Sequence, residues 1–152
     1  MLLLLVAIAV FIVDRLTKVA IQQNLPLGQH VSVVGDLLWF DHSQNTGIAF
    51  SLATSHSSIV FVFDVLAILF IVYLARRVPA GERWMRLGLG LVLGGAIGNV
   101  VDRVLAGSVT DFIDFRVFPV FNVADSAITV GAVLIAWRLY RGSNQAGEED
   151  EG

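Results

Sequence analysis

The sequence predicts an all-α membrane protein: a bundle of four transmembrane helices with a small extracytoplasmic β-sheet or hairpin between helices 1 and 2. Of its 152 residues, 56% are hydrophobic and 15% are charged, and the mean hydropathy is +0.76. So few polar side chains could not cover an ordinary water-facing surface. Four apolar stretches also approach the roughly 20 residues needed to cross a hydrocarbon core about 30 Å thick.

The four predicted spans are residues 1–21, 58–75, 87–105 and 122–140. The first begins MLLLLVAIAVFIVD, without the basic residues or the small-residue cleavage site of a removable signal peptide, and is expected to be retained. The spans place residues 1–141 in a single membrane domain. The acidic end GSNQAGEEDEG predicts a disordered cytoplasmic tail over residues 142–152.

The segment between the first two spans reads HVSVVGDLLWFDHSQNTGIAFSL. Short β-prone runs alternate here with turn signals at Gly35-Asp36 and Asn45-Thr46-Gly47, which is typical of a small sheet or hairpin.

The distribution of basic residues predicts the orientation of the bundle. Residues 21–57 contain no Lys or Arg, whereas six arginines flank the other ends of the spans: Arg76, Arg77, Arg83, Arg86, Arg138 and Arg141. Basic residues near membrane ends accumulate on the cytoplasmic side. Both termini are therefore expected in the cytoplasm.

This orientation brings the polar residues of all four spans to the outer leaflet. They are Asp14, Lys18, Asp64, Asn99, Asp102, Arg103, Asn122 and Asp125. Ionisable groups within a bilayer are costly unless paired or facing a cavity, so a cluster at one depth indicates a functional site. Asp14 and Lys18, spaced i,i+4, also fit a purely structural ion pair.

A stripe of small residues leads into this cluster. Gly90, Gly94 and Gly98 recur every four residues, and Asp102 is the next position on the same helix face. Such a stripe lets another helix approach closely.

The types of residue present exclude several classes of catalytic chemistry. There is no cysteine, and His30, His42 and His56 lack the H-E-x-x-H spacing of zinc hydrolases. Ser108 lacks a G-x-S-x-G elbow and a histidine in or near the spans to activate it. We therefore expect no metal and no cofactor, and two carboxyl groups remain as the candidate machinery for amide hydrolysis.

Asp111 and Asp125 lie on segments joined by a short connection and can face one another. Asp125 is expected in the first helical turn, where the helix dipole favours an anion, and Asn122 could cap that turn. Asp114 is the rival to Asp111, although Arg116 is close to it in sequence. Spacing alone leaves this choice open.

Five stretches resemble, in order, the motifs of the lipoprotein signal peptidase family, also called signal peptidase II: DRLTK (14–18), NTGIAF (45–50), GGAIGNVVDR (94–103), VTDFIDF (109–115) and FNVADSAI (121–128). The resemblance implies a bacterial membrane aspartic peptidase that cleaves prolipoproteins N-terminal to a diacylglyceryl-modified cysteine and is the target of globomycin. The family's catalytic residues fall on Asp111 and Asp125. Its supporting positions fall on Asp14, Lys18, Asn45, Gly47, Asn99, Asp102, Arg103, Asn122 and Ala124.

The resemblance also implies the partners and the location. The partners are prolipoprotein substrates and membrane lipids, with no nucleic acid, and the protein is expected to act as a monomer in the bacterial cytoplasmic membrane with its site near the extracytoplasmic face. Asp64 matches no motif of the family and is expected beside Lys18 or water.

Two other functions are compatible with a chain of this composition. A small proton- or cation-coupled transporter or channel subunit is the first, but such proteins more often show an internal repeat and sites near the midplane. A purely structural assembly partner is the second, and it would tolerate uncharged replacements of Asp111 and Asp125.

Overall fold

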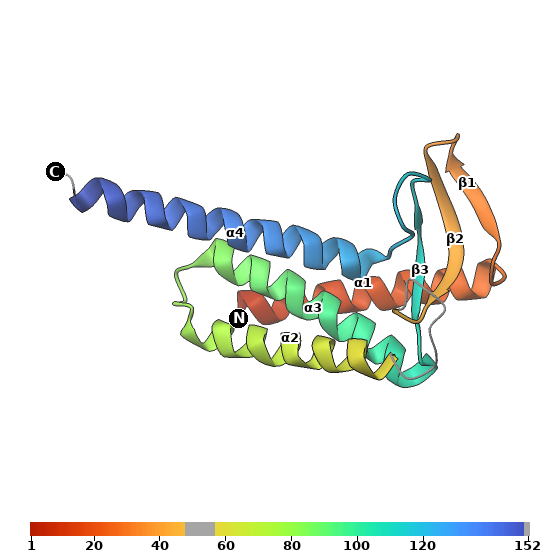
Figure 1. Ribbon diagram of the computed structural model, residues 1–152, viewed down its shortest axis with the longest axis horizontal. Helices are drawn as coiled ribbons and strands as arrows, with labels where there is room; N and C mark the ends of the chain where they lie inside the picture. The colour runs from red at the N-terminus through yellow and green to blue at the C-terminus, as the bar shows by residue number, and fades with distance from the viewer. Residues whose placement is uncertain (48–56, 151–152) are drawn as a thin grey trace.

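The computed structural model describes residues 1–47 and 57–150, which form four helices and three strands. The elements are α1 (Leu2–Asn24), β1 (His30–Val34), β2 (Leu38–Asn45), α2 (Ser57–Arg77), α3 (Arg83–Ala106), β3 (Val109–Asp114) and α4 (Val123–Asp150). The helices run side by side, and the sheet stands across one end of the bundle (Figure 1). All four predicted spans are therefore confirmed as helices.

Among the described residues, two stretches are long and apolar enough to cross a membrane: Arg83–Ala106 and Val123–Gly142. Three charged residues interrupt the apolar sequence of α1: Asp14, Arg15 and Lys18. In α2, Asp64 lies within the apolar sequence, and Arg76 and Arg77 end the helix. Length and composition thus mark two of the four helices as membrane spans.

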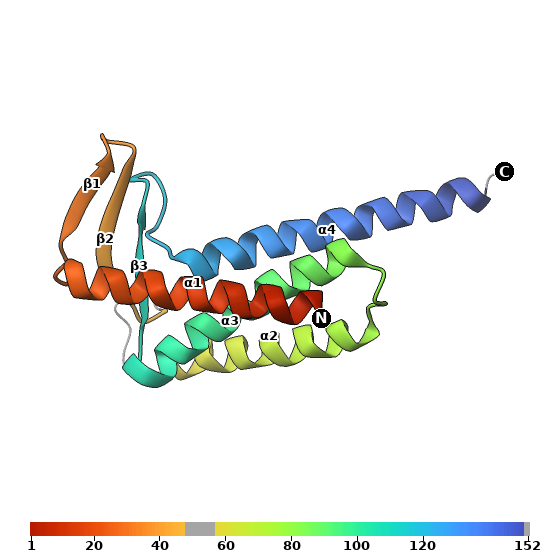
Figure 2. The ribbon, with the colours of Figure 1, turned by 180° about the vertical axis from the view of Figure 1, so that it is seen from behind.

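Helix α3 lies between the other helices (Figure 2), and its glycines allow two of them to approach closely. A Cβ atom at Gly90 would lie 2.8 Å from the Leu3 carbonyl oxygen, and one at Gly94 would lie 2.5 Å from the Ala7 carbonyl oxygen. On another face of α3, a Cβ at Gly95 would lie 2.5 Å from the Ala124 carbonyl oxygen. The first two glycines of the predicted stripe therefore make a helix contact with the backbone of α1.

The sheet has three antiparallel strands in the order β1-β2-β3. The predicted hairpin between helices 1 and 2 is confirmed as β1 and β2, but the third strand comes from the connection between α3 and α4. That strand was not predicted, because it is stabilised by pairing with a distant segment of the chain, as in the pair Ser43 and Asp111.

The connection after β3 folds back on the strand. The Phe121 carbonyl oxygen accepts hydrogen bonds from the backbone N–H groups of Phe112 (3.0 Å) and Ile113 (2.7 Å), and the Phe121 N–H donates to the Ile113 carbonyl oxygen (3.1 Å). These bonds place the first turn of α4 beside β3.

The last helix extends beyond the predicted membrane domain. Helix α4 continues to Asp150, so the backbone of residues 142–150 is helical. Extending a formed helix adds one hydrogen bond per residue without the cost of nucleation, and this stretch contains no proline to stop it. The division into a domain of residues 1–141 and a separate tail stays a prediction.

Candidate active site

Asp111 and Asp125 lie on two elements that meet at the sheet end of the bundle. Asp111 is on β3 and is 2% exposed, while Asp125 is half-buried in the first turn of α4. The Asn122 Oδ1 atom accepts a hydrogen bond from the Asp125 backbone N–H (3.0 Å), and the Asp125 Oδ2 atom accepts one from the Asn122 N–H (3.3 Å). The predicted helix cap is therefore confirmed, and it fixes the rotamer of Asp125.

Two asparagines link the carboxyl groups to each other. Asn122 Nδ2 donates to Asp111 Oδ1 (2.6 Å), and Asn99 Nδ2 donates to Asp125 Oδ1 (2.8 Å). The two amides also meet, since Asn122 Nδ2 lies 3.4 Å from Asn99 Oδ1. Each carboxyl group thus receives one amide donor from a pair of side chains that hold each other in place.

The surroundings of Asp111 favour its protonated form. Burial raises the pKa of Asp111 above its usual value, the donor from Asn45 Nδ2 at 2.8 Å lowers it, and the negative charge of Asp125 raises it again. The net effect is a raised pKa. This carboxyl group therefore holds a proton to higher pH than an exposed aspartate does.

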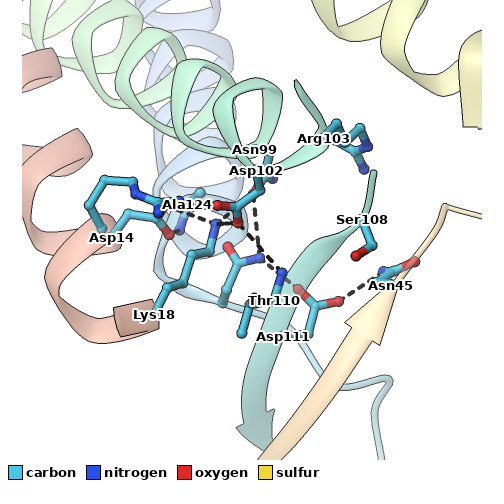
Figure 3. Close-up of polar contacts among 12 residues, drawn as sticks. Asp14, Lys18, Asn45, Asn99, Asp102, Arg103, Ser108, Thr110, Asp111 and Ala124 are labelled. Atoms are coloured by element: carbon cyan, nitrogen blue, oxygen red, sulfur yellow. Dashed lines mark hydrogen bonds and ion pairs between the residues drawn. The ribbon is translucent and has the colours of Figure 1, made fainter. Parts of the chain in front are cut away.

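The buried ammonium group of Lys18 lies between Asp14, Asp102 and Asn99 (Figure 3). Lys18 Nζ lies 2.8 Å from Asp14 Oδ2, 2.8 Å from Asp102 Oδ2 and 3.0 Å from Asn99 Oδ1. Its side chain is 0% exposed, and these three acceptors match its three N–H donors. The expected Asp14–Lys18 ion pair is confirmed, and it connects to the candidate site through Asn99.

Asp14 also ties α1 to the start of α4. Its Oδ1 atom accepts a hydrogen bond from the Ala124 N–H (2.9 Å), and both residues are completely buried. A Cβ at Gly98 would come within 2.6 Å of Asp14 Oδ2. The last glycine of the stripe thus makes room for a carboxylate rather than for a helix backbone.

Arg15 is a member of this cluster that the sequence did not reveal. Its guanidinium forms an ion pair with Asp102 Oδ1, so two carboxylates are balanced by two cations. Asp102 Oδ2 also lies 3.5 Å from the Thr110 N–H on β3. Arg15 and Asp102 are 87 positions apart in the sequence, and no sequence pattern indicated this pair.

Two predicted residues lie at the edge of the site. Arg103 points away from Lys18, and its Nη1 atom lies 2.6 Å from Asp64 Oδ2, so it joins α3 to α2. Asp64 therefore does not pair with Lys18, but its side chain is 26% exposed, as the expected contact with water requires. Gly47 has a φ of +80° and its N–H donates to Asn45 Oδ1 (2.7 Å), which orients Asn45 toward Asp111. Residues 48–50 of the motif NTGIAF lie outside the described residues.

Asp114, the rival carboxylate, is engaged elsewhere. It accepts a hydrogen bond from the Arg116 N–H (2.6 Å), and its Oδ2 atom lies 3.3 Å from Arg116 Nε. The Arg116 guanidinium in turn lies over the ring of Trp39, 4.1 Å from its centroid. Since Asp111 and Asp114 are three residues apart on one strand, they point to opposite faces of the sheet.

An apolar cavity of about 390 Å³ opens beside Asp125. Its wall is formed by Phe115, Phe118, Phe121, Ser126, Thr129 and Val130. The cavity can hold an apolar group of a ligand, and a polar bond next to that group would then lie beside the Asp125 carboxyl group.

The fold and this arrangement define a helical membrane protein whose polar site is built around paired carboxyl groups. Residues 6–141 match the family model described as signal peptidase (SPase) II, and the chain belongs to this family. The chain is 41% identical to a lipoprotein signal peptidase of Pseudomonas aeruginosa (strain UCBPP-PA14), with 97% of this chain and 92% of that protein covered. It is 36% identical to one of Moorella thermoacetica, with 96% and 97% covered.

A solved structure described as a bacterial membrane enzyme has the same fold. The TM-score is 0.85 at 31% identity, covering 94% of this chain and 90% of that one. A second such structure has a TM-score of 0.84 at 32% identity, covering 90% and 91%. The chain is therefore a membrane-embedded bacterial protease of the signal peptidase II family, as its motifs indicated, and nothing in these comparisons supports a transporter.

Proposed function

We propose that Asp111 and Asp125 form the catalytic pair of an aspartic endopeptidase that cleaves prolipoproteins N-terminal to the diacylglyceryl-modified cysteine. The observation that carries this proposal is the linkage of the two carboxyl groups through Asn122 and Asn99. In this proposal the enzyme acts as a monomer.

The chemistry requires one proton shared by two carboxyl groups. The ionised aspartate takes a proton from water as the water oxygen attacks the scissile carbonyl carbon, while the protonated aspartate donates its proton to the carbonyl oxygen. When the tetrahedral intermediate collapses, the proton acquired from water passes to the leaving amine, the C–N bond breaks, and the hydroxyl proton returns to the pair. The raised pKa of Asp111 is consistent with a pair that keeps one proton near neutral pH.

The other predicted site residues have supporting roles in this proposal. The ammonium of Lys18, paired with Asp14 and Asp102, holds Asn99 in place. Asp14 also fixes the start of α4, because it accepts a hydrogen bond from the Ala124 N–H. Asn45, oriented by Gly47, donates to Asp111 from the other side. Arg103 fixes α2 against α3 beside the site through its ion pair with Asp64.

The apolar surfaces support a position in the membrane with four spans. Besides α3 and α4, helix α1 exposes Leu5 (57%) and Ile8 (54%), and α2 exposes Phe63 (66%) and Leu69 (59%). Contiguous exposed apolar surface of this kind is suited to lipid. The cavity beside Asp125 has the chemistry to accept an acyl chain or an apolar side chain of the signal peptide.

The proposed orientation follows from the charges. Six of the nine arginines lie on the helix halves farthest from the sheet, so we place both termini in the cytoplasm and the carboxyl pair near the extracytoplasmic face. A bond between a membrane signal peptide and a lipid-modified cysteine lies at that same interface.

The test compares three substitutions in the purified protein acting on a diacylglyceryl-modified prolipoprotein. Asp111→Asn and Asp125→Asn are expected to lower kcat by about 10²- to 10⁴-fold, the usual contribution of a general acid or base. Asp114→Asn, the matched control on the same strand, is expected to keep most of the activity. Chelators are expected to have no effect.

Near-normal turnover by either Asp111→Asn or Asp125→Asn would overturn the assignment of the pair. A loss with Asp114→Asn equal to the loss with Asp111→Asn would do the same, provided that thermal unfolding in detergent shows all three variants to be folded.

A further inference from the structure

A second cavity lies at the end of the bundle opposite the carboxyl pair, near the α2–α3 connection on the left of Figure 1. Its volume is about 600 Å³, within the range of about 300–1,000 Å³ that small-molecule sites occupy. The apolar wall is formed by Leu74, Val78, Met85, Ile135 and Leu139, which come from the end of α2, the connection that follows it, the start of α3 and the middle of α4. We call this space the arginine-rimmed cavity.

Two arginines reach the cavity, and they differ in their partners. Arg138 makes two hydrogen bonds to Glu82, from Nε to Oε2 (2.8 Å) and from Nη2 to Oε1 (2.7 Å), so its charge is balanced. Arg77 makes no ion pair with a carboxylate of the described residues; its guanidinium lies 5.0 Å from the centroid of the Tyr73 ring. The rim therefore carries one uncompensated cation.

The wider charge of this end has the same sign. Four more arginines lie on the last turn of α2, the first turn of α3 and α4: Arg76, Arg83, Arg86 and Arg141. The next acidic residue along α4 after the cavity is Glu148, six residues or about 9 Å beyond Gly142. An anionic group at Arg77 would thus meet a positive local potential.

We propose that the arginine-rimmed cavity binds one anionic phospholipid of the adjoining leaflet, with its phosphate at Arg77 and an acyl chain along the apolar wall. The cavity borders surface suited to lipid, since Leu139 is 60% exposed and Tyr73 is 52% exposed. Inorganic phosphate would leave the apolar wall empty, and a zwitterionic lipid would bring a second cation toward Arg77. An anionic lipid satisfies both parts of the site.

This site is independent of the proposed catalysis, because none of its residues belongs to the polar cluster around Lys18 or to the carboxyl pair. The lipid would occupy the space between α2 and α4, beside the start of α3. Its binding would therefore be expected to stabilise the packing of these three helices without changing the reacting groups.

The test is native mass spectrometry of the purified full-length protein, released from neutral detergent after incubation with an equimolar mixture of phosphatidylglycerol and phosphatidylcholine. One phosphatidylglycerol is expected to be retained in preference to phosphatidylcholine. Arg77→Gln should weaken this binding about fivefold, which corresponds to about 1 kcal/mol. Arg76→Gln removes the same charge from the adjacent residue, which does not line the cavity, and should weaken binding less than about twofold.

A second pair of variants tests the apolar wall. Leu139→Trp fills the cavity and should reduce retention of phosphatidylglycerol, whereas Val133→Trp, at another exposed position of α4, should not. Added inorganic phosphate should not displace the lipid. Cleavage of a prolipoprotein by each variant serves as the check that it is folded.

Three results would overturn the proposal. Equal retention of the two lipids would show that the net negative charge of the headgroup does not contribute to binding. Equal effects of Arg76→Gln and Arg77→Gln would show that the lipid is attracted by the overall positive charge of this surface and not by Arg77 in particular. Unchanged retention by Leu139→Trp would show that the lipid lies outside the cavity.

Discussion

Asn122 has two separable roles, and two substitutions distinguish them. Its Oδ1 atom caps α4 through the Asp125 N–H, and its Nδ2 atom donates to Asp111 Oδ1. Asn122→Ser keeps a side-chain oxygen that can cap the helix but removes the amide donor. Asn122→Ala removes both, so a difference between the two variants isolates the cap.

The structure sets the size of each effect. A hydrogen bond to a charged group contributes about 1.5–3 kcal/mol, and tenfold in rate corresponds to about 1.36 kcal/mol, so loss of the donor should lower kcat/KM by about 10- to 100-fold in both variants. Loss of an N-cap costs about 1 kcal/mol. We therefore expect Asn122→Ala to unfold more readily than Asn122→Ser by about that amount.

The pH dependence should move in a defined direction. The Asn122 donor favours the ionised form of Asp111, so its removal raises the pKa of Asp111 further. The carboxyl pair then loses its shared proton at higher pH, and the basic limb of the kcat/KM profile moves to higher pH. Because the folded pKa of Asp111 lies above the unfolded value, stability falls as pH rises from 3.8 through the raised pKa, and the substitution extends that window upward.

The assay is cleavage of a diacylglyceryl-modified prolipoprotein across a pH series, together with thermal unfolding in detergent. Wild-type kcat/KM and an unmoved basic limb in Asn122→Ser would refute the argument that this amide acts on Asp111. A shift of the limb to lower pH would show that the sign is wrong.

Two further predictions concern the packing and the buried charges. Gly94→Ala places a methyl group 2.5 Å from the Ala7 carbonyl oxygen, which forces α1 from α3, and should destabilise the protein by about 1–3 kcal/mol in detergent unfolding. Gly81→Ala, where no atom lies within 4 Å of the new Cβ, is the matched control and should be neutral; equal effects would contradict the close-packing argument. Lys18→Met leaves two buried carboxylates without their shared cation and should cost about 3–5 kcal/mol with loss of activity, and a stability within about 1 kcal/mol of wild type would show that the ammonium is not needed to hold them.

The helices could be predicted because their signal is local. An apolar run of about 20 residues satisfies the backbone within itself wherever the rest of the chain lies. The glycine stripe of α3 is also local, since residues four apart share one helix face. The cap of α4 by Asn122 needed only three residues of sequence.

The sheet and the cluster depended on partners far along the chain. Strand β3 forms against β2, and its pairing places Asp111 opposite Ser43. The pair of Arg15 with Asp102 and that of Arg103 with Asp64 cross from one helix to another. No periodicity within a segment records which distant side chain will complete an ion pair.

The sequence by itself determined the apolar helices, the close contact along the α3 glycines and, by resemblance, the two aspartates of interest. The tertiary structure alone decided that Asn122 and Asn99 join those aspartates, that Asp114 faces the other way, and that a third strand carries Asp111. The physical reason is the range of each interaction: backbone hydrogen bonds and helix faces are set within a few residues, whereas buried carboxylates find their donors only when the helices pack.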